Sequence, residues 1–147
     1  AAAVGMGRFE VERGVAETAT FADAPTDLSD YQYLIIPDVA LVHSRLTAAA
    51  FAGKADVWSN NGVALSRKYP ENVLGRIFRI EQIFDFGSKE LKKLLKGKKI
   101  EIFRRDFPFA NNEICRRFSV KEGAAERWCF TRIGGKLLAI KIVPHQR

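Results

Sequence analysis

The chain has 147 residues, of which 47% are apolar and 28% charged, with a formal net charge of +7. A domain of this length buries roughly 68 to 70% of its unfolded surface, so the chain can form one domain or two small ones, and its composition favours a folded protein over a disordered one. No apolar run approaches the roughly 20 residues that span a bilayer, and the opening AAAVGMGRF lacks a signal-peptide pattern, so we expect a cytoplasmic protein without a membrane partner.

The first thirty residues give few signals. The small residues at the start, without an initiating Met, are typical of a piece cut from a longer protein. Phe9 and Val11 alternate with acids and residues 15–21 can return as a second strand, which favours a hairpin. Residues 23–30 are polar and contain Pro, so they are predicted to form a loop.

The rest of the first half predicts a strand followed by a helix. Residues 31–36 have the composition of a buried strand, and Pro37 suits the first turn of a helix because its missing N–H is not needed there. That helix is expected over residues 37–51. Residues 57–65 predict either a strand broken by a turn or a tight hairpin. Residues 67–75 then form a loop and a candidate boundary between two lobes.

The second half begins with a predicted strand and a basic helix. Even spacing predicts that one face of the strand carries Phe78, Ile80, Phe84 and Phe86. Ser88 can cap the helix that follows, and Gly97 can end it. Inside it, three leucines form an inward stripe opposite four lysines: Leu91, Leu94 and Leu95 against Lys89, Lys92, Lys93 and Lys96.

The remaining elements complete a βαβαββ order. A second strand begins at Ile100, and Asn111 is a good cap for a helix whose inward residues are Ile114, Cys115 and Phe118. Residues 121–123 predict a turn. A hairpin at Gly134-Gly135 then joins two strands, the first with Trp128 and Phe130 on one face and Cys129, Thr131 and Ile133 on the other. We therefore predict an α+β fold with helices layered on a sheet.

Positive charge is concentrated in the second half. Up to Pro70 there are six Lys and Arg residues against eight acids, whereas from Glu71 onward there are eighteen against nine. Such asymmetry points to nucleic acid or another anionic surface. We expect the basic side chains between Ser88 and Lys121 to converge on one outward patch able to grip a polyphosphate. The alternative is that they are only the solvated face of a helix.

RNA would be held through its phosphates by these side chains, with little reading of its sequence, and Arg planes could stack on unpaired bases. The predicted contacts are Arg76, Arg79, Lys89, Lys92, Lys93, Lys96, Lys98, Lys99, Arg104, Arg105, Arg116 and Arg117. Four nearby aromatic residues resemble stacking platforms, but core packing is the better prediction for each: Phe103, Phe107, Phe109 and Trp128. The corner at residues 107–109 is the first to test for an exposed role.

No arrangement of residues predicts catalysis within this chain. His43 falls in a predicted helix and His145 in the tail, and neither has a Ser or Cys at a spacing that would pair it as a base. Asp38 is better explained as an acid that complements a helix dipole than as a general base. Cys115 and Cys129 are too few for a metal cluster or a disulfide framework, and we expect buried, reduced thiols. No catalytic, cofactor-binding or metal-binding residue is predicted.

Several short patterns occur in one order along the chain: Tyr33-Leu34, Pro37-Asp38, GRIFRI at residues 75–80, the Lys/Leu helix after Ser88, RRDFP at residues 104–108, and Thr131-Arg132 before a Gly hairpin. In this order they resemble the C-terminal portion of a group of bacterial S-adenosylmethionine-dependent methyltransferases. The resemblance covers residues 8–143, and its most specific parts are GRIFRI and RRDFP together.

The resemblance implies a ferredoxin-like lobe at residues 1–70 and a THUMP-like, RNA-binding lobe at residues 71–147. The chain has neither a glycine-rich cofactor fingerprint nor an Asn-Pro-Pro-aromatic tetrapeptide, so the catalytic domain is absent and S-adenosylmethionine would belong to the parent enzyme. The implied role is non-catalytic: to bind structured RNA or present it to an N-terminal methyltransferase domain of the same chain. The alternative is a structural module that docks on and orients that domain without touching nucleic acid.

Overall fold

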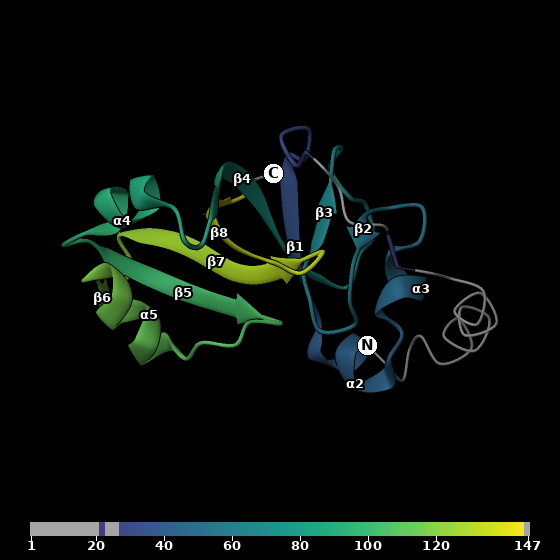
Figure 1. The fold of residues 1–147 in the computed structure, drawn as a ribbon. Coiled ribbons are helices and arrows are strands. Elements are labelled where there is room, and N and C mark those ends of the chain that lie inside the picture. Colours follow the sequence, from purple (N-terminus) through teal and green to yellow (C-terminus); the bar gives the residue numbers. More distant parts are fainter. Residues whose placement is uncertain (1–20, 23–26, 146–147) are drawn as a thin grey trace.

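Eight strands form one mixed sheet in a computed structural model of the chain, which describes residues 21–22 and 27–145 (Figure 1). The spatial order of the strands is β2-β3-β1-β4-β8-β7-β5-β6. The elements are β1 (Tyr33–Pro37), α2 (Val39–Ser44), α3 (Thr47–Phe51), β2 (Asp56–Val57), β3 (Ala64–Ser66), β4 (Gly75–Asp85), α4 (Lys89–Leu95), β5 (Lys99–Arg105), α5 (Asn111–Phe118), β6 (Lys121–Glu122), β7 (Glu126–Ile133) and β8 (Lys136–Pro144). The predicted α+β fold class is confirmed. The hairpin expected over residues 9–21 lies outside the described residues, except for Phe21.

The single helix predicted over residues 37–51 is wrong, because the chain forms two short helices there. Pro37 is the last residue of β1, where it pairs with Gly75 of β4. Asp38 caps α2, since its carboxylate accepts a hydrogen bond of 3.0 Å from the Ala40 N–H. Arg45 then takes a left-handed conformation with φ of 57°, which ends α2 before α3 begins. Asp38 thus has a structural role, as the N-cap of α2 and not as the first-turn acid that was predicted.

The segment after α3 forms an antiparallel pair, β2 and β3, which resolves the choice between a broken strand and a hairpin in favour of the hairpin. Its connection spans residues 58–63 and is longer than the tight turn that was predicted. β3 also pairs with β1, and β1 pairs with β4. The predicted loop after β3 is confirmed. The sheet is therefore continuous on either side of the loop that contains the expected lobe boundary.

The single apolar face predicted for β4 is wrong, because the strand contains a bulge. Ile80 pairs with Ile142 and Gln82 pairs with Lys141, so Glu81 is the extra residue. An extra residue reverses the alternation of side chains beyond it. Phe78 and Ile80 accordingly pack in one core cluster, whereas Phe84 packs against another.

The two basic helices of the second half are confirmed, with changes at their ends. Ser88 caps α4 as predicted, accepting a hydrogen bond of 3.3 Å from the Leu91 N–H. The N-cap of α5 is Ala110 and not Asn111. Asn111 instead donates to a carboxylate oxygen of Glu122 at 2.9 Å. The turn predicted at residues 121–123 is a short strand, β6, which pairs in parallel with β5.

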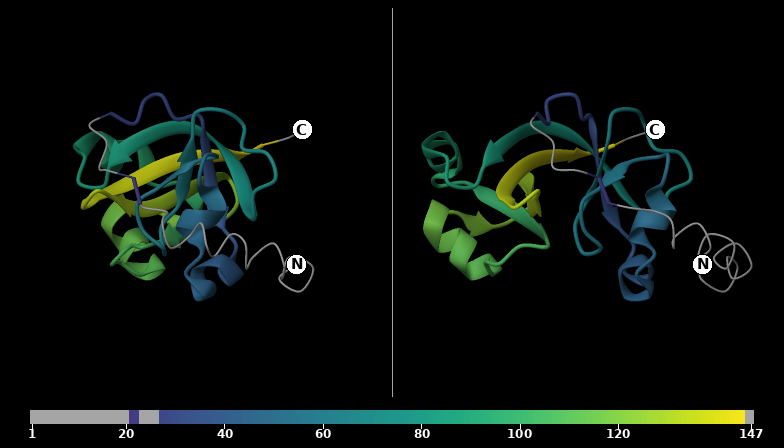
Figure 2. Two further views of the ribbon diagram at one scale, coloured as in Figure 1. Left: turned by 90° about the vertical axis from the view of Figure 1, so that its right-hand side faces the viewer. Right: turned by 45° about the vertical axis from the view of Figure 1, so that its right-hand side comes forward.

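The hairpin of β7 and β8 is confirmed, with Gly134 and Gly135 at φ of 59° and 82° in its turn. Its two faces belong to different clusters, as the alternation predicted: Cys129 packs on one face, and Trp128 and Phe130 pack on the other. The second cluster also contains the buried residues of α4 and α5. Figure 1 and the right-hand view of Figure 2 place these two helices at the end of the molecule opposite α2 and α3.

Candidate nucleic-acid interface

A groove between α4 and α5 brings together four of the predicted RNA-binding side chains. Lys89 and Lys92 come from α4, and Arg116 and Arg117 come from α5. The groove has a volume of about 550 Å³, and its remaining lining is Phe86, Gly87, Ser88 and Phe118. No carboxylate lines it. Four positive charges thus face one hollow that contains no opposing acid.

Helical spacing explains why these four side chains point into the same space. Leu91 and Leu95 are fully buried and fix the inner side of α4, so Lys89 and Lys92, three residues apart, share an outer side. Ile114 and Phe118 do the same for α5 and leave Arg116 and Arg117 at the surface. The Gly97 N–H donates to the Ser119 carbonyl at 2.8 Å, which holds the two helix ends together.

The floor of the groove is an aromatic cluster centred on Phe86. Its ring centroid lies 5.0 to 6.0 Å from four others, and the set is Phe107, Phe109, Phe118 and Phe130. The Arg117 guanidinium carbon lies 4.6 Å from the centre of the Phe86 ring, a cation–π distance. Core packing is therefore confirmed for Phe107 and Phe109. Phe86 also holds Arg117 in place within the groove.

The cations that line the groove differ from Lys98 in whether they form ion pairs with acidic side chains. Among the described residues, no acid forms an ion pair with Lys89, Lys92 or Arg116. Lys98, by contrast, forms a 2.9 Å ion pair with Glu126. The charges in the groove are consequently available to an anion, while that of Lys98 is already balanced.

The other predicted cations do not join this groove. Lys93, Lys96 and Lys99 are exposed but are not part of its lining. Arg104 is a structural clamp, because its Nε donates to Asn111 Oδ1 at 2.6 Å and its Nη1 to the Phe109 carbonyl at 3.0 Å. These bonds tie β5 to the start of α5.

The prediction of a single cationic patch is wrong. Arg104 pairs with Phe130 and Arg105 with Thr131, so the two arginines point to opposite faces of the sheet. Arg76 lies on the side of Arg105, with its guanidinium 5.0 Å from the Phe78 ring centre and 5.4 Å from that of Phe103. Strand alternation separates these residues, which sequence proximity alone had grouped. Arg79 occupies the middle of the sheet, opposite Tyr33 and Val143.

The groove lies in the part of the chain that matches a known protein family. Residues 75–142 match the family model described as THUMP domain-like. This THUMP-like region runs from the start of β4 into β8 and includes every residue of the groove. No curated protein matches the chain.

A solved structure with a similar fold is that of a protein described as a putative methyltransferase from Porphyromonas gingivalis W83. The similarity has a TM-score of 0.74, covers 90% of this chain and involves 18% sequence identity. The chain spans 33% of the length of that protein. At this identity the likeness establishes the fold, which includes the THUMP-like region and the strands before it.

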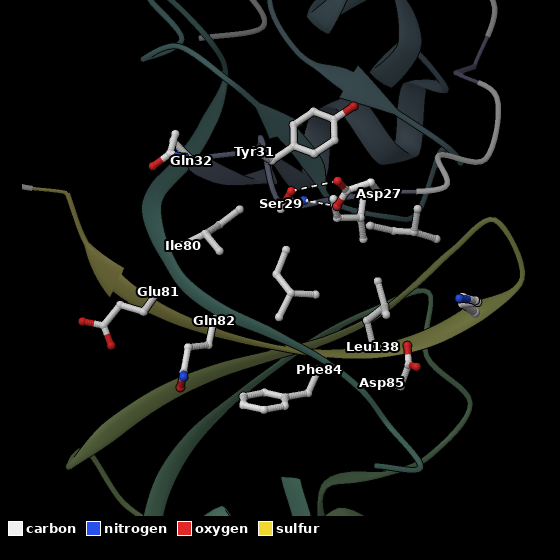
Figure 3. Close-up of a pocket in the computed structure, with 14 residues that line it drawn as sticks. Asp27, Ser29, Tyr31, Gln32, Ile80, Glu81, Gln82, Phe84, Asp85 and Leu138 are labelled. Atoms are coloured by element: carbon white, nitrogen blue, oxygen red, sulfur yellow. Dashed lines mark hydrogen bonds between the residues drawn. The ribbon is translucent and has the colours of Figure 1, made fainter. Parts of the chain in front are cut away.

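A second hollow, of about 550 Å³, lies beside the bulge of β4 and was missed by sequence reasoning. Figure 3 shows Asp27 and Ser29 on one side of it and Glu81, Gln82, Phe84 and Asp85 on the other. The backbone N–H and hydroxyl of Ser29 lower the pKa of Asp27. Because Glu81 and Asp85 also line it, this hollow is unsuited to a polyanion. The residues around the bulge form one wall of this hollow, and local sequence patterns do not predict a bulge.

A third hollow, of about 720 Å³, contains a buried tyrosine with a polar partner. The Tyr31 hydroxyl donates to Asp56, and the Arg67 guanidinium lies 4.5 Å from the centre of the Tyr31 ring. Burial, with the hydrogen bond to Asp56, raises the pKa of Tyr31 to about 12. The hydroxyl therefore stays protonated at neutral pH and links the segment before β1 to β2.

The histidines and cysteines, which could serve in catalysis or metal binding, do not line the groove between α4 and α5. His43 is exposed on α2, and His145 packs against the rings of Tyr33 and Tyr69. Both cysteines are free thiols, and burial raises the pKa of each. The described residues contain no group of His, Cys, Asp and Glu that could hold a metal ion. None of their helices is long and apolar enough to cross a membrane.

Proposed function

We propose that the chain is a non-catalytic, RNA-binding module of a methyltransferase, and that the groove between α4 and α5 holds phosphates of structured RNA. The observation that carries this proposal is the meeting of Lys89, Lys92, Arg116 and Arg117 around one hollow without a lining carboxylate. The THUMP-like match over residues 75–142 and the fold shared with a protein described as a putative methyltransferase support it. S-adenosylmethionine would bind to a separate catalytic domain of the parent protein. That domain would receive the RNA from this module.

The chemistry of the four side chains suits a phosphodiester backbone. Lys89 and Lys92 supply flexible point charges, whereas the guanidinium groups of Arg116 and Arg117 can bind two oxygens of one phosphate. Each phosphate that they neutralise releases condensed counterions. Binding of this kind depends strongly on salt and weakly on sequence, which fits a module that positions RNA for an enzyme.

The test compares two neighbouring lysines on the same helix. Lys92 lines the groove and Lys93 does not, although both are exposed. We expect Lys92→Gln to reduce the slope of log affinity against log salt for an RNA hairpin by about 0.7 to 0.9. Lys93→Gln should change the slope by less than half as much. Binding would be measured by fluorescence anisotropy with the 147-residue chain.

Two results would contradict the proposal. Equal slopes for the two variants would show that the groove does not hold phosphates. Undetectable binding of the unmodified chain, even at low salt, would remove the RNA-binding role. The chain would then be better explained as a module that docks on the catalytic domain and orients it.

A further inference from the structure

A smaller hollow adjoins the cationic groove and differs from it in chemistry. It has a volume of about 310 Å³ and is lined by Phe86, Phe109, Glu113, Arg116 and Arg117. Three of these residues, Phe86, Arg116 and Arg117, also line the cationic groove. The two hollows are therefore neighbours that share a wall, and a ligand with an anionic part and a flat part can occupy both.

The smaller hollow has flat surfaces suited to a base. Phe109 is half-buried and stacks on Phe86 with an interplanar angle of 20°, so its ring is fixed but only partly covered. The Arg117 guanidinium is also fixed by its contact with the Phe86 ring. A nucleobase can stack on an aromatic ring or on a guanidinium plane. Because Phe86 already holds the Phe109 ring and the Arg117 guanidinium, these groups lose little conformational freedom when a base stacks on them.

Glu113 is the one carboxylate among the lining residues. Its Oε1 accepts a hydrogen bond of 3.3 Å from the Ala110 N–H, which fixes the side chain at the start of α5. Its Oε2 has no hydrogen-bond partner or cation within the described part of the chain. Glu113 is exposed, so water solvates this oxygen, and a ligand group that replaces the water has to be a donor because a carboxylate only accepts. Phosphates are repelled by it, so the donor comes from a base or from a ribose 2′-hydroxyl.

We propose that the smaller hollow binds an unpaired base of the RNA and that Glu113 selects bases with an exocyclic amino group. This inference rests on the proposed function, because the adjoining phosphate occupies the cationic groove. Cytosine, adenine and guanine carry an exocyclic amino group that donates, whereas uracil has carbonyl oxygens instead and donates only from its ring N3–H. In a duplex that amino group is already hydrogen-bonded to the opposite strand. The site therefore takes a base from a loop, a bulge or an end.

The experiment measures the affinity of the 147-residue chain for ten-nucleotide oligocytidylate and oligouridylate at one salt concentration. The two oligomers carry the same phosphates, so the ratio of their affinities isolates the base. A hydrogen bond to a charged group predicts a preference of about tenfold for cytosine. Glu113→Gln retains an acceptor for the Ala110 N–H but presents an amide donor to the ligand, and we expect it to reduce the preference to twofold or less.

Glu90→Gln is the matched control, since Glu90 is an exposed acid in the first turn of α4 that does not line either hollow. It removes the same charge near the groove and should leave the cytosine preference unchanged. Equal affinity for both oligomers in the unmodified chain, with Lys92→Gln still lowering the salt slope, would overturn the base site and keep the proposed function. An unchanged preference in Glu113→Gln would also overturn it. If the chain binds neither oligomer nor the RNA hairpin at low salt, both the base site and the proposed function are overturned.

Discussion

Replacing Phe86 by Leu should weaken both the core cluster beneath α4 and α5 and the groove between these helices. Phe86 is 4% exposed and its ring contacts four other aromatic rings and the Arg117 guanidinium. Aromatic pairs contribute roughly 0.5 to 1.5 kcal/mol each beyond their buried area, and contributions that share one ring are not additive. Leucine preserves most of the apolar area. We therefore expect the free energy of unfolding to fall by about 2 to 3 kcal/mol.

Urea unfolding followed by tryptophan fluorescence measures this loss. With a slope of about 2 kcal/mol per molar urea, the midpoint should move down by roughly 1 M or slightly more. Phe84→Leu is the control, because Phe84 is half-buried and, among the described residues, its ring contacts one other ring, that of Trp128 at 6.0 Å. It should cost about 1 kcal/mol. An equal cost for the two variants would refute the view that Phe86 is the centre of the aromatic cluster.

The same variant connects the core to RNA binding. Arg117 keeps its charge in Phe86→Leu but loses the ring that holds it. RNA affinity should therefore fall severalfold, while the salt slope stays within about 0.2 of its original value, since the number of neutralised phosphates is set by charge. A slope that falls as in Lys92→Gln would show that Arg117 leaves the groove altogether when the ring is removed.

Two further predictions concern stability. Gly75→Ala should lower the free energy of unfolding by about 1 to 3 kcal/mol, because the added Cβ would lie 2.5 Å from the Ile36 carbonyl oxygen. Gly87→Ala, where an added Cβ has nothing within 4 Å, should change it by less than about 0.5 kcal/mol. Thermal unfolding of both variants tests this difference. Burial raises the pKa of Cys129 to about 12, so the unfolded chain loses that proton first and stability should fall as the pH rises from about 9 toward 12, by at most about 1.4 kcal/mol per pH unit. Urea titrations across this range should show a smaller fall in Cys129→Ala, and an identical fall would contradict the role of this thiol.

Local signals in the sequence were sufficient for most elements of the second half. The Ser88 cap, the leucine stripe of α4, the glycine pair before β8 and the alternation along β7 involve neighbours only a few residues apart. Interactions of this range are expressed in the spacing of residue types. The same signals separated Cys129 from Trp128 and Phe130 on the two faces of β7, and they placed Phe107 and Phe109 in the core.

Local signals failed where distant strands determine the structure. Pro37 belongs to β1 because it pairs with Gly75, and Glu81 forms a bulge because β8 opposes β4. Asn111 does not cap α5, since its side chain is engaged by Arg104 and Glu122. Each of these outcomes depends on a partner far along the chain or on another element. Helical and strand periodicity carries no information about such partners.

The basic composition of residues 71–147 and the apolar faces of their helices follow from the sequence alone, because charge and periodicity are properties of the chain itself. Which cations face a common hollow was decided by the tertiary structure. Strand alternation sent Arg104 and Arg105 to opposite faces, while the packing of α4 against α5 brought Lys89 and Lys92 beside Arg116 and Arg117. The reason is geometric: convergence of side chains depends on how elements pack, and packing is set by contacts between residues that the sequence keeps apart.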